Sequence, residues 1–352
     1  MARTSFSNIC ISGIAAAVPK GVVNNLDAHP FISPDEKQKT VKLTGMLEYR
    51  KASSEICASD LCLKAATDLF AAMNFDPLDV NAIIFVTQTP DYRMPSTACV
   101  LQNKLGCSQS TLAFDINLGC SGFVYGLYTS ASFIAGGGLD NVLLLCGDTQ
   151  SKLSYEKDKN VCFIMGDAGT ATLVSKRKVS SHINMVLMTD GSRYDKLIVP
   201  AGGFRLPSTA ETREVKKEPD GGIRSQEHVH MEGMDIFNFS SIDVVNTIKG
   251  FLEEYRIDIE KIDYLVLHQA NKFMTDKIAR KLKFQPEKVL YSLERFGNTS
   301  CASIPLTIAH HFSGQREAGI KHCLLSGFGV GLSWGVADVF LDEICCPPIA
   351  EV

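Results

Sequence analysis

The order of segments in the first half of this chain recurs in the second half, and this repeat limits the possible folds more than any other feature. An amphipathic stretch precedes the apolar run Ala82–Thr87, and another precedes the apolar run Tyr264–His268. Short apolar runs of this kind are typical of buried strands, whereas the stretches before them have helical spacing. Their alternation indicates an α/β fold in which helices cover a sheet.

Two glycine turns occupy matching places in the repeat. One expected strand, Leu112–Leu118, leads through a glycine and Cys120 into a helical stretch. Another, Val289–Leu293, leads through a glycine and Asn298 into a second helical stretch. Cys120 and Asn298 are 178 positions apart, close to the 181 that separate the ends of the two apolar runs above. Such offsets favour one duplicated unit over two unrelated α/β domains.

We therefore predict two pseudo-symmetric halves, residues 1–180 and 181–352, with the seam in the polar run around residue 180. The segment Lys196–Gly233 breaks the pattern because it combines many charges with prolines and glycines. A polar segment of this length is expected to be a binding loop, a lid or a mobile connection.

Composition narrows the classes of function. The 352 residues carry a formal net charge of −4, so no global positive field favours nucleic acid as a partner. We expect a cytoplasmic protein that does not enter the membrane, because no apolar run reaches the length of a membrane span and the first residues lack a signal-peptide pattern. The twelve cysteines include no CxxC pair, and we expect them to be reduced.

Cys120 has the sequence context of a nucleophile. It follows an expected strand and a glycine and stands where a helix should begin. Unpaired N–H groups and the helix dipole at that place are expected to stabilise a thiolate and lower the cysteine pKa. The alternative is a small buried residue at a tight helix start.

His268 and Asn298 stand at similar places in the second half. His268 ends an apolar strand, and Asn298 occupies the turn that matches the Cys120 turn. Ligands of α/β sheets bind outside the carboxyl ends of the strands, so the repeat brings these three polar residues toward one site. Either residue alone would more often be structural.

The segments DINLGCSGFVYGL, LVLHQAN, RFGNTSCASIPL and GFGVGLSWG resemble the signature segments of β-ketoacyl-[acyl carrier protein] synthase III. The similarity follows the same order over nearly the whole chain. It implies the thiolase-like α/β fold, with two duplicated halves in a layered α-β-α-β-α core, and a homodimer. Elongating synthases use a second histidine where this chain has Asn298.

The resemblance implies a decarboxylative Claisen condensation, as in the initiation of fatty-acid synthesis. Cys120 would accept an acyl group from a thioester, and the backbone N–H groups of Cys120 and Val330 would form an oxyanion hole. His268 and Asn298 would stabilise the enolate left when malonyl-[acyl carrier protein] loses CO2. This chemistry implies no metal and no redox cofactor. The histidines His228 and His230 in the polar segment are too few to indicate a metal site.

The chain departs from the family pattern where members hold coenzyme A. Lys39 and Leu43 stand in place of a tryptophan and an arginine, and Asn160 replaces a further arginine. The usual coenzyme A clamp is therefore expected to be absent, which favours an acyl donor on a carrier protein or an unusual donor. The donor's chain length and the pathway stay open.

The resemblance also assigns residues outside the catalytic centre. Arg280 and Lys281 match basic positions that dock the acidic carrier protein, and Lys272 lies on the same expected helix. An ordinary solvated helix face is the alternative for these charges. Met94 matches the residue that reaches across the dimer to the floor of the acyl pocket.

Three other functions compete with that of a condensing enzyme. Papain-like proteases share the order Cys, His, Asn, but their cysteine lies in a different motif near the mature N-terminus. A thiolase-fold acyltransferase or a condensing enzyme of a specialised pathway, acting on an alcohol, an amine or another acceptor, is closer. A non-catalytic partner subunit is disfavoured because such subunits usually lose the cysteine.

Overall fold

Two main sheets form the frame of the protein. The computed structural model describes residues 2–178, 182–314 and 319–352. The first sheet runs in the order β17 (Ala350–Glu351), β2 (Ile9–Val18), β8 (Asp167–Lys176), β7 (Asn141–Thr149), β5 (Ala82–Val86) and β6 (Leu112–Ile116). The second runs in the order β1 (Ala2–Ser7), β9 (His182–Thr189), β16 (Ser333–Leu341), β15 (Lys321–Gly329) and β14 (Tyr264–Leu267).

The two sheets share one strand order, which agrees with the predicted duplication. The series β2-β8-β7-β5 corresponds to β9-β16-β15-β14, and β5–β7 and β14–β15 are parallel pairs in equivalent positions. The prediction of a strand at Val289–Leu293, the counterpart of β6, is wrong. Val289 makes only an isolated bridge to Leu265, and Leu293 already begins a helix. The second sheet therefore ends one strand earlier.

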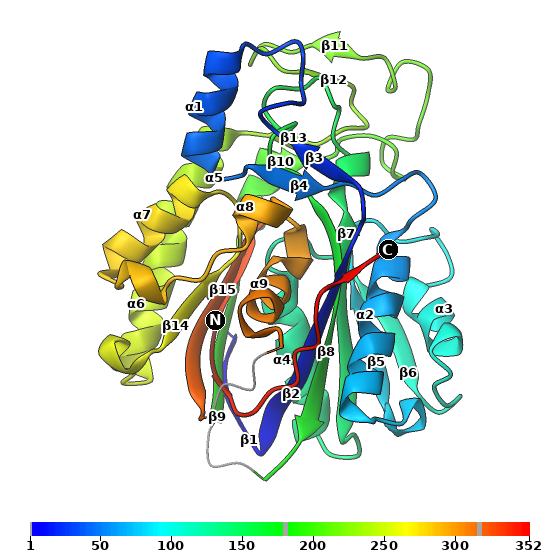
Figure 1. Ribbon diagram of the computed structural model, residues 1–352, viewed down its shortest axis with the longest axis vertical. Coiled ribbons are helices and arrows are strands. Elements are labelled where there is room, and N and C mark those ends of the chain that lie inside the picture. Colours follow the sequence, from blue (N-terminus) through cyan, green and yellow to red (C-terminus); the bar gives the residue numbers. More distant parts are fainter. Residues whose placement is uncertain (1, 179–181, 315–318) are drawn as a thin grey trace.

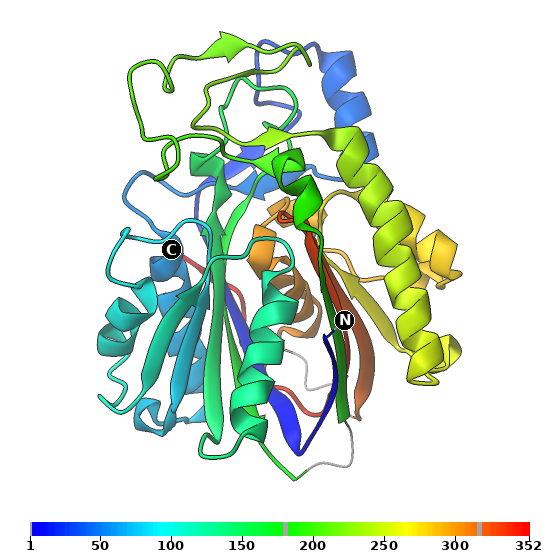
Figure 2. The same ribbon diagram turned by 180° about the vertical axis from the view of Figure 1, so that it is seen from behind.

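Helices fill three layers around and between the sheets (Figures 1 and 2). The middle layer holds α4 (Gly122–Ala135) and α9 (Ser303–Phe312), each of which contacts strands of both sheets. The outer layers hold α2 (Ala58–Met73) and α3 (Thr97–Lys104) on the first sheet and α6 (Val245–Glu254) and α7 (Lys272–Leu282) on the second. The remaining helices are α1 (Pro34–Thr44), α5 (Gly233–Phe239) and α8 (Leu293–Phe296). The layered α-β-α-β-α architecture is confirmed.

Local sequence explains where these elements form. All five residues of β5 are apolar and buried, as expected for a strand covered on both faces. Helix α7 begins where the Asn271 side chain accepts a hydrogen bond from the Met274 N–H at 2.8 Å, and it ends at Lys283 in the left-handed conformation. No helix in the described part of the chain is long and apolar enough to cross a membrane.

The strands at the two chain termini each join the sheet of the opposite half. Strand β1 pairs with β9 in the second sheet, and β17 pairs with β2 in the first. The predicted boundary at residue 180 lies outside the described residues. The division into 1–180 and 181–352 stays a prediction, and the exchanged terminal strands mean that each sheet contains residues from both ranges.

Gly169 in β8 is required by the close approach of α2. A Cβ at Gly169 would lie 2.5 Å from the Cys62 nitrogen and 2.6 Å from the Leu61 Cβ. Overpacking of a core site costs roughly 1–3 kcal/mol and sometimes more. We expect Gly169→Ala to lower the free energy of unfolding in urea by about 3 kcal/mol because both close neighbours belong to a helix that must move.

Gly250 in α6 provides the matched control. A Cβ there would meet no atom within 4 Å. Gly250→Ala should leave the free energy of unfolding unchanged or raise it by up to about 1 kcal/mol, because alanine is the better helix former. Equal effects of the two substitutions would contradict the packing explanation.

Candidate active site

The Cys120 turn is pressed against the end of β15. Cys120 lies between β6 and α4, and Gly122 donates to the Gly119 carbonyl at 2.7 Å. A Cβ at Gly329 would lie 2.6 Å from the Cys120 Cβ, and one at Gly327 would lie 3.1 Å from the Cys120 carbonyl oxygen. Two glycines of the second half therefore make room for the cysteine of the first half.

The predicted direction of the Cys120 pKa is wrong. Burial of the side chain raises the pKa of the Cys120 thiol to about 11, and the negative charge of Asp148 acts in the same direction. Hydrogen bonds from the backbone N–H groups of Val330 and of Cys120 itself lower the pKa, but by less than burial raises it. Both N–H donors lie outside helix α4, one in the Val330 turn and one on Cys120 itself, and desolvation of the thiolate is the larger effect.

The Val330 turn joins β15 to β16 and is fixed by two serines. Ser333 Oγ donates to the Val330 carbonyl at 2.7 Å and lies 2.6 Å from Ser121 Oγ, which follows the cysteine. The backbone N–H groups of Val330 and of Cys120 itself both hydrogen-bond with the Cys120 sulfur. This is the arrangement required of two oxyanion-hole donors, and the role itself stays a prediction.

His268 is buried and held in a neutral form. It follows β14, is 1 % exposed, and its Nδ1 lies 2.7 Å from Ser303 Oγ at the start of α9. Burial lowers the pKa of His268 to about 3, against a smaller opposing effect of a hydrogen bond with the Ser300 backbone. At neutral pH the ring therefore has one N–H group and one acceptor nitrogen.

Asn298 is oriented by its own turn. Its Oδ1 accepts the Ser300 N–H at 2.9 Å, which leaves the amide NH2 available to donate. The backbone is joined to the first half, because the Asn298 N–H donates to the Ile164 carbonyl at 2.8 Å and Gly166 donates back at 3.0 Å. The turn needs Gly297, which has a φ of +66° and whose Cβ would lie 2.7 Å from the Ile164 oxygen.

Ser300 connects the three predicted catalytic residues. Its N–H binds the Asn298 side chain, its backbone hydrogen-bonds with His268, and its hydroxyl lies beside the Cys120 thiol. The structure therefore brings Cys120, His268 and Asn298 together around one short turn, η7 (Ser300–Ala302). Their catalytic roles stay predictions at this point.

Sequence reasoning missed Ser300, Ser303 and Asp148. Ser300 and Ser303 lie in the same segment as Asn298, but no hydrophobic pattern around either serine indicates a functional role. Asp148 lies near the carboxyl end of β7 and is fully buried. A signal existed for Asp148, because a carboxylate after the apolar run Val142–Cys146 lies at the carboxyl end of a strand, where sheets of this class place their ligands.

The three predicted docking residues all lie on α7 but have different surroundings. Arg280 is exposed, and its Nε donates to the Asp276 carbonyl at 3.2 Å. Lys272 forms an ion pair with Asp276 at 3.0 Å. Lys281 donates to the Ser241 carbonyl at 2.7 Å and so joins α7 to the π-helical turn before α6. Of the three side chains, Arg280 is the most available to a partner.

The positions related to the donor lie on exposed surfaces. Lys39 and Leu43 are exposed on α1, which contacts α7, and Leu43 is 57 % exposed. Met94 is 82 % exposed in this single chain. A thioether so exposed is compatible with a place at a subunit contact.

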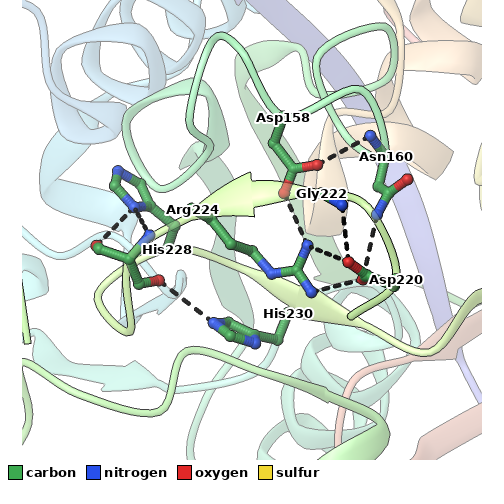
Figure 3. Close-up of polar contacts among 8 residues, drawn as sticks. Asp158, Asn160, Asp220, Gly222, Arg224, His228 and His230 are labelled. Atoms are coloured by element: carbon green, nitrogen blue, oxygen red, sulfur yellow. Dashed lines mark hydrogen bonds and ion pairs between the residues drawn. The ribbon is translucent and has the colours of Figure 1, made fainter. Parts of the chain in front are cut away.

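The segment Lys196–Gly233 is more ordered than the sequence suggested. It follows a 3-10 helix that ends at Lys196 and contains the short strands β10 (Leu197–Ile198), β11 (Lys216–Lys217), β12 (Ile223–Arg224) and β13 (His230–Met231). Figure 3 shows the Arg224 side chain between Asp158 and Asp220. Its Nη1 lies 3.0 Å from Asp158 Oδ2, and its Nη2 lies 2.6 Å from Asp220 Oδ2. Because Arg224 and Asp158 are both buried, this ion-pair cluster fastens the segment to the main body.

Asn160 belongs to the same cluster. Its Nδ2 donates to Asp220 at 3.2 Å, and its N–H donates to Asp158 at 3.0 Å (Figure 3). His228 and His230 each hydrogen-bond with Ser225, through its hydroxyl and its carbonyl respectively. Within the described residues, no group of three or more histidine, cysteine or acidic side chains is arranged to hold a metal ion.

Comparisons with known proteins agree with this geometry. The profile of the family described as 3-oxoacyl-[acyl-carrier-protein (ACP)] synthase III matches residues 114–191, and that of its C terminal matches residues 252–339. A beta-ketoacyl-[acyl-carrier-protein] synthase III of Caldanaerobacter subterraneus is 33% identical over 92% of this chain and 95% of its own length.

Similar relationships hold for a second relative and for a solved structure. The synthase III of Clostridioides difficile is 32% identical over 94% of this chain and 97% of its own length. The crystal structure of a 3-oxoacyl-(acyl-carrier protein) synthase from Burkholderia xenovorans superposes with a TM-score of 0.93 at 34% identity, covering 100% of this chain and 99% of that one. The thiolase-like fold is thereby confirmed.

Stability should depend on pH through His268. The unfolded chain binds a proton at this ring below its ordinary pKa of 6.5, whereas the folded chain does so only near pH 3. Between these values the unfolded state holds more protons, so stability falls as the pH falls. Lowering the pH from 7 to 5 should cost about 2 kcal/mol through this residue alone.

The matched variant is His268→Gln, which has no titrating ring. Urea unfolding of both proteins at pH 7 and 5 isolates the contribution of His268 from that of the buried carboxyls. The wild type should lose about 2 kcal/mol more than the variant. Parallel losses in the two proteins would show that His268 already titrates normally in the folded state.

Proposed function

Because the chain belongs to the 3-oxoacyl-[acyl-carrier-protein] synthase III family, we propose that it catalyses the condensation of an acyl thioester with malonyl-[acyl carrier protein]. The product is a 3-oxoacyl-[acyl carrier protein], and the reaction initiates fatty-acid synthesis. The observation that carries the proposal is the Ser300 turn, which joins Cys120, His268 and Asn298 in one buried site.

The first stage is transfer of the acyl group to Cys120. The thiol sulfur attacks the thioester carbonyl, the carbon–sulfur bond to the carrier breaks, and the carrier leaves as a thiol. The backbone N–H groups of Cys120 and Val330 already reach the sulfur, so they stand beside the carbonyl oxygen of the bound acyl group. Two such donors stabilise the negative charge of the tetrahedral intermediate.

The second stage is loss of CO2 from the malonyl thioester. The electron pair of the breaking bond enters an enolate whose oxygen needs hydrogen-bond donors. Asn298 has its Oδ1 occupied by the Ser300 N–H and offers its NH2 group. His268 is neutral, and it offers an Nε2–H when the Ser303 hydroxyl donates to its Nδ1.

Condensation closes the cycle. The malonyl-derived carbanion attacks the acyl carbon on Cys120, a carbon–carbon bond forms, and the Cys120 sulfur leaves as a thiolate that takes up a proton from solvent. The same two backbone N–H groups serve the second tetrahedral intermediate. None of these steps draws on a metal ion or a redox cofactor, so the proposal includes neither.

The proposed partners are an acyl carrier protein and an acyl donor that does not depend on the usual coenzyme A clamp. Exposed Arg280 presents positive charge on α7, beside α1 with Lys39 and Leu43. Complementary charge between such a face and an acidic carrier would orient the encounter. The cytoplasm is the proposed location, supported by twelve free cysteines, which suit a reducing compartment.

The proposed assembly is a homodimer that pairs two copies of β6. This strand is the edge of the first sheet, and Leu112 on it is 50 % exposed. An unpaired edge of this kind is a template for another strand. Pairing two first sheets across a twofold axis would also cover Met94, which is 82 % exposed in the single chain.

Intact-protein mass spectrometry tests the reaction. The protein is incubated with a panel of acyl-coenzyme A and acyl-carrier-protein thioesters and then with malonyl-[acyl carrier protein]. We expect an acyl adduct on Cys120, absent in Cys120→Ala, that the malonyl thioester discharges as a 3-oxoacyl product. An adduct that leaves only with an alcohol or an amine would make the protein an acyltransferase of a specialised pathway instead.

Two further variants separate the stages. His268→Ala and Asn298→Ala should still form the acyl adduct but lose malonyl decarboxylation by roughly 10²–10³-fold each, because each removes one donor to the enolate. Release of CO2 from malonyl-[acyl carrier protein] is the measurement. Loss of adduct formation with unchanged decarboxylation would reverse the assigned roles.

Ala113→Pro tests the dimer. The N–H of Leu112 and the carbonyl of Ile116 both point toward the β5 side of the strand. Because successive residues of a strand point their N–H groups to opposite sides, the Ala113 N–H points away from the sheet. Proline would remove this outward donor and keep the pairing with β5. We expect wild type to sediment as a dimer and the variant as a monomer with similar circular dichroism. A monomeric wild type would contradict the proposed assembly.

A further inference from the structure

The groups assigned so far leave the Cys120 thiol without a proton acceptor. With a pKa near 11, only about one thiol in 10,000 is ionised at pH 7. His268 has a pKa of about 3 and holds its Nδ1 against Ser303, so it is a poor base for this proton. The neighbouring Val330 and Cys120 N–H groups only donate.

A buried carboxyl lies behind the nucleophile. Asp148 is fully buried, and its Oδ1 accepts hydrogen bonds from the Gln88 N–H at 2.7 Å and from the hydroxyls of Thr87 and Thr89 at 3.1 Å each. Its Oδ2 accepts from the weak thiol donor Cys301 at 3.5 Å, and the side chains of Ser300 and Gln150 also hydrogen-bond with this carboxyl. One oxygen is thus saturated and the other retains capacity to accept a proton.

The Ser300 hydroxyl is a neighbour of both the thiol and this carboxyl. As a hydrogen-bonding group it acts on both the Cys120 thiol and the Asp148 carboxyl. Ser300 is 3 % exposed, and its Oγ has no partner at ordinary hydrogen-bond distance and angle. A buried hydroxyl without a fixed partner is costly, which calls for a function. The residue is also held at a φ of +53°, which a non-glycine residue rarely adopts.

We propose that Ser300 and Asp148 form the proton route of the nucleophile, with Ser300 touching the reacting sulfur and Asp148 acting through Ser300. This inference rests on the proposed acylation of Cys120. The Cys120 S–H bond breaks as its proton passes to Ser300 Oγ, while the Ser300 proton passes to the Asp148 carboxylate. The sulfur then attacks the acyl carbon. The departing carrier thiolate takes the proton back along the same route, so Asp148 ends ionised as it began.

The groups around Asp148 leave it without a competing base. The titratable side chains that act on it or are affected by it are the thiols of Cys62, Cys120 and Cys301. Burial raises the pKa of each of these thiols, so they stay protonated at neutral pH. Burial also raises the pKa of Asp148, which makes its carboxylate a stronger base than an exposed one.

The decisive variants are Ser300→Gly and Ser300→Ala, because glycine accepts the positive φ and alanine retains a Cβ. The rate of single-turnover acylation of Cys120 at pH 7, followed by intact mass, should fall roughly 10²-fold in both. Asp148→Asn should give a similar loss, and the double variant should lose no more than the single ones, because both residues serve one route.

The pH profile is a second readout. Between pH 7 and 10 the acylation rate of the variants should rise about tenfold per pH unit, because free thiolate forms, and that of the wild type should rise much less.

Thr299→Val is the matched control. Its Oγ1 is also buried without a partner in the same turn, and valine keeps its shape. This variant should acylate at the wild-type rate, and thermal unfolding of all variants checks the fold. Wild-type-like acylation in Ser300→Gly would overturn the proposal. Faster acylation in Asp148→Asn would do the same, because a purely electrostatic neighbour raises the thiol pKa and its removal speeds reaction.

Alkylation separates failure of the proton route from failure of the proposed function. Iodoacetamide modification of Cys120, located by peptide mapping among the twelve cysteines, needs no acyl donor and no condensation. At pH 7 it should slow at least tenfold in Ser300→Gly and stay unchanged in Thr299→Val. Equal alkylation rates in the two variants would reject the route even if condensation is demonstrated.

Discussion

The middle helical layer is the constraint on which the rest of the structure depends. Helices α4 and α9 each pack against both sheets, so the inner faces of the two sheets share one apolar core, and each outer face has a further core of its own. Shared burial of this kind fixes the sheets relative to each other because interiors are packed to near-crystalline density. The segment that precedes each of these helices is thereby fixed as well, and those segments carry Cys120 and Asn298.

Contact between the halves is close enough that glycine is the only tolerated residue at several points. Gly327 and Gly329 of β15 lie against the Cys120 turn, and Gly166 and Gly297 allow the Asn298 turn to cross the first half. Two fully buried or nearly buried polar residues, Asp148 and Ser300, lie at this contact. Their desolvation is the cost of placing chemistry at the centre of the molecule and not on a loop.

Desolvation also decides the charge state of the site. The thiol of Cys120 is protonated and the ring of His268 is neutral for the same reason, since burial disfavours the charged form of each. A neutral histidine and an asparagine amide are suitable donors for an enolate that forms only during the reaction. Fixed donors in a dry site stabilise developing charge more strongly than the same groups do in water.

The sequence by itself determined the duplicated α/β fold and the three residues at the ends of its strands. Apolar runs and glycine turns recur at nearly constant offsets. Such local patterns can be recognised in the sequence without knowing how the elements pack. The sequence did not determine the direction of the Cys120 pKa, the absence of a strand at Val289–Leu293, or the parts played by Ser300, Ser303 and Asp148. These were decided by tertiary structure, because burial and contacts between residues distant in the sequence, such as His268 with Ser303 or Asp148 with Cys301, leave no periodic trace in the chain.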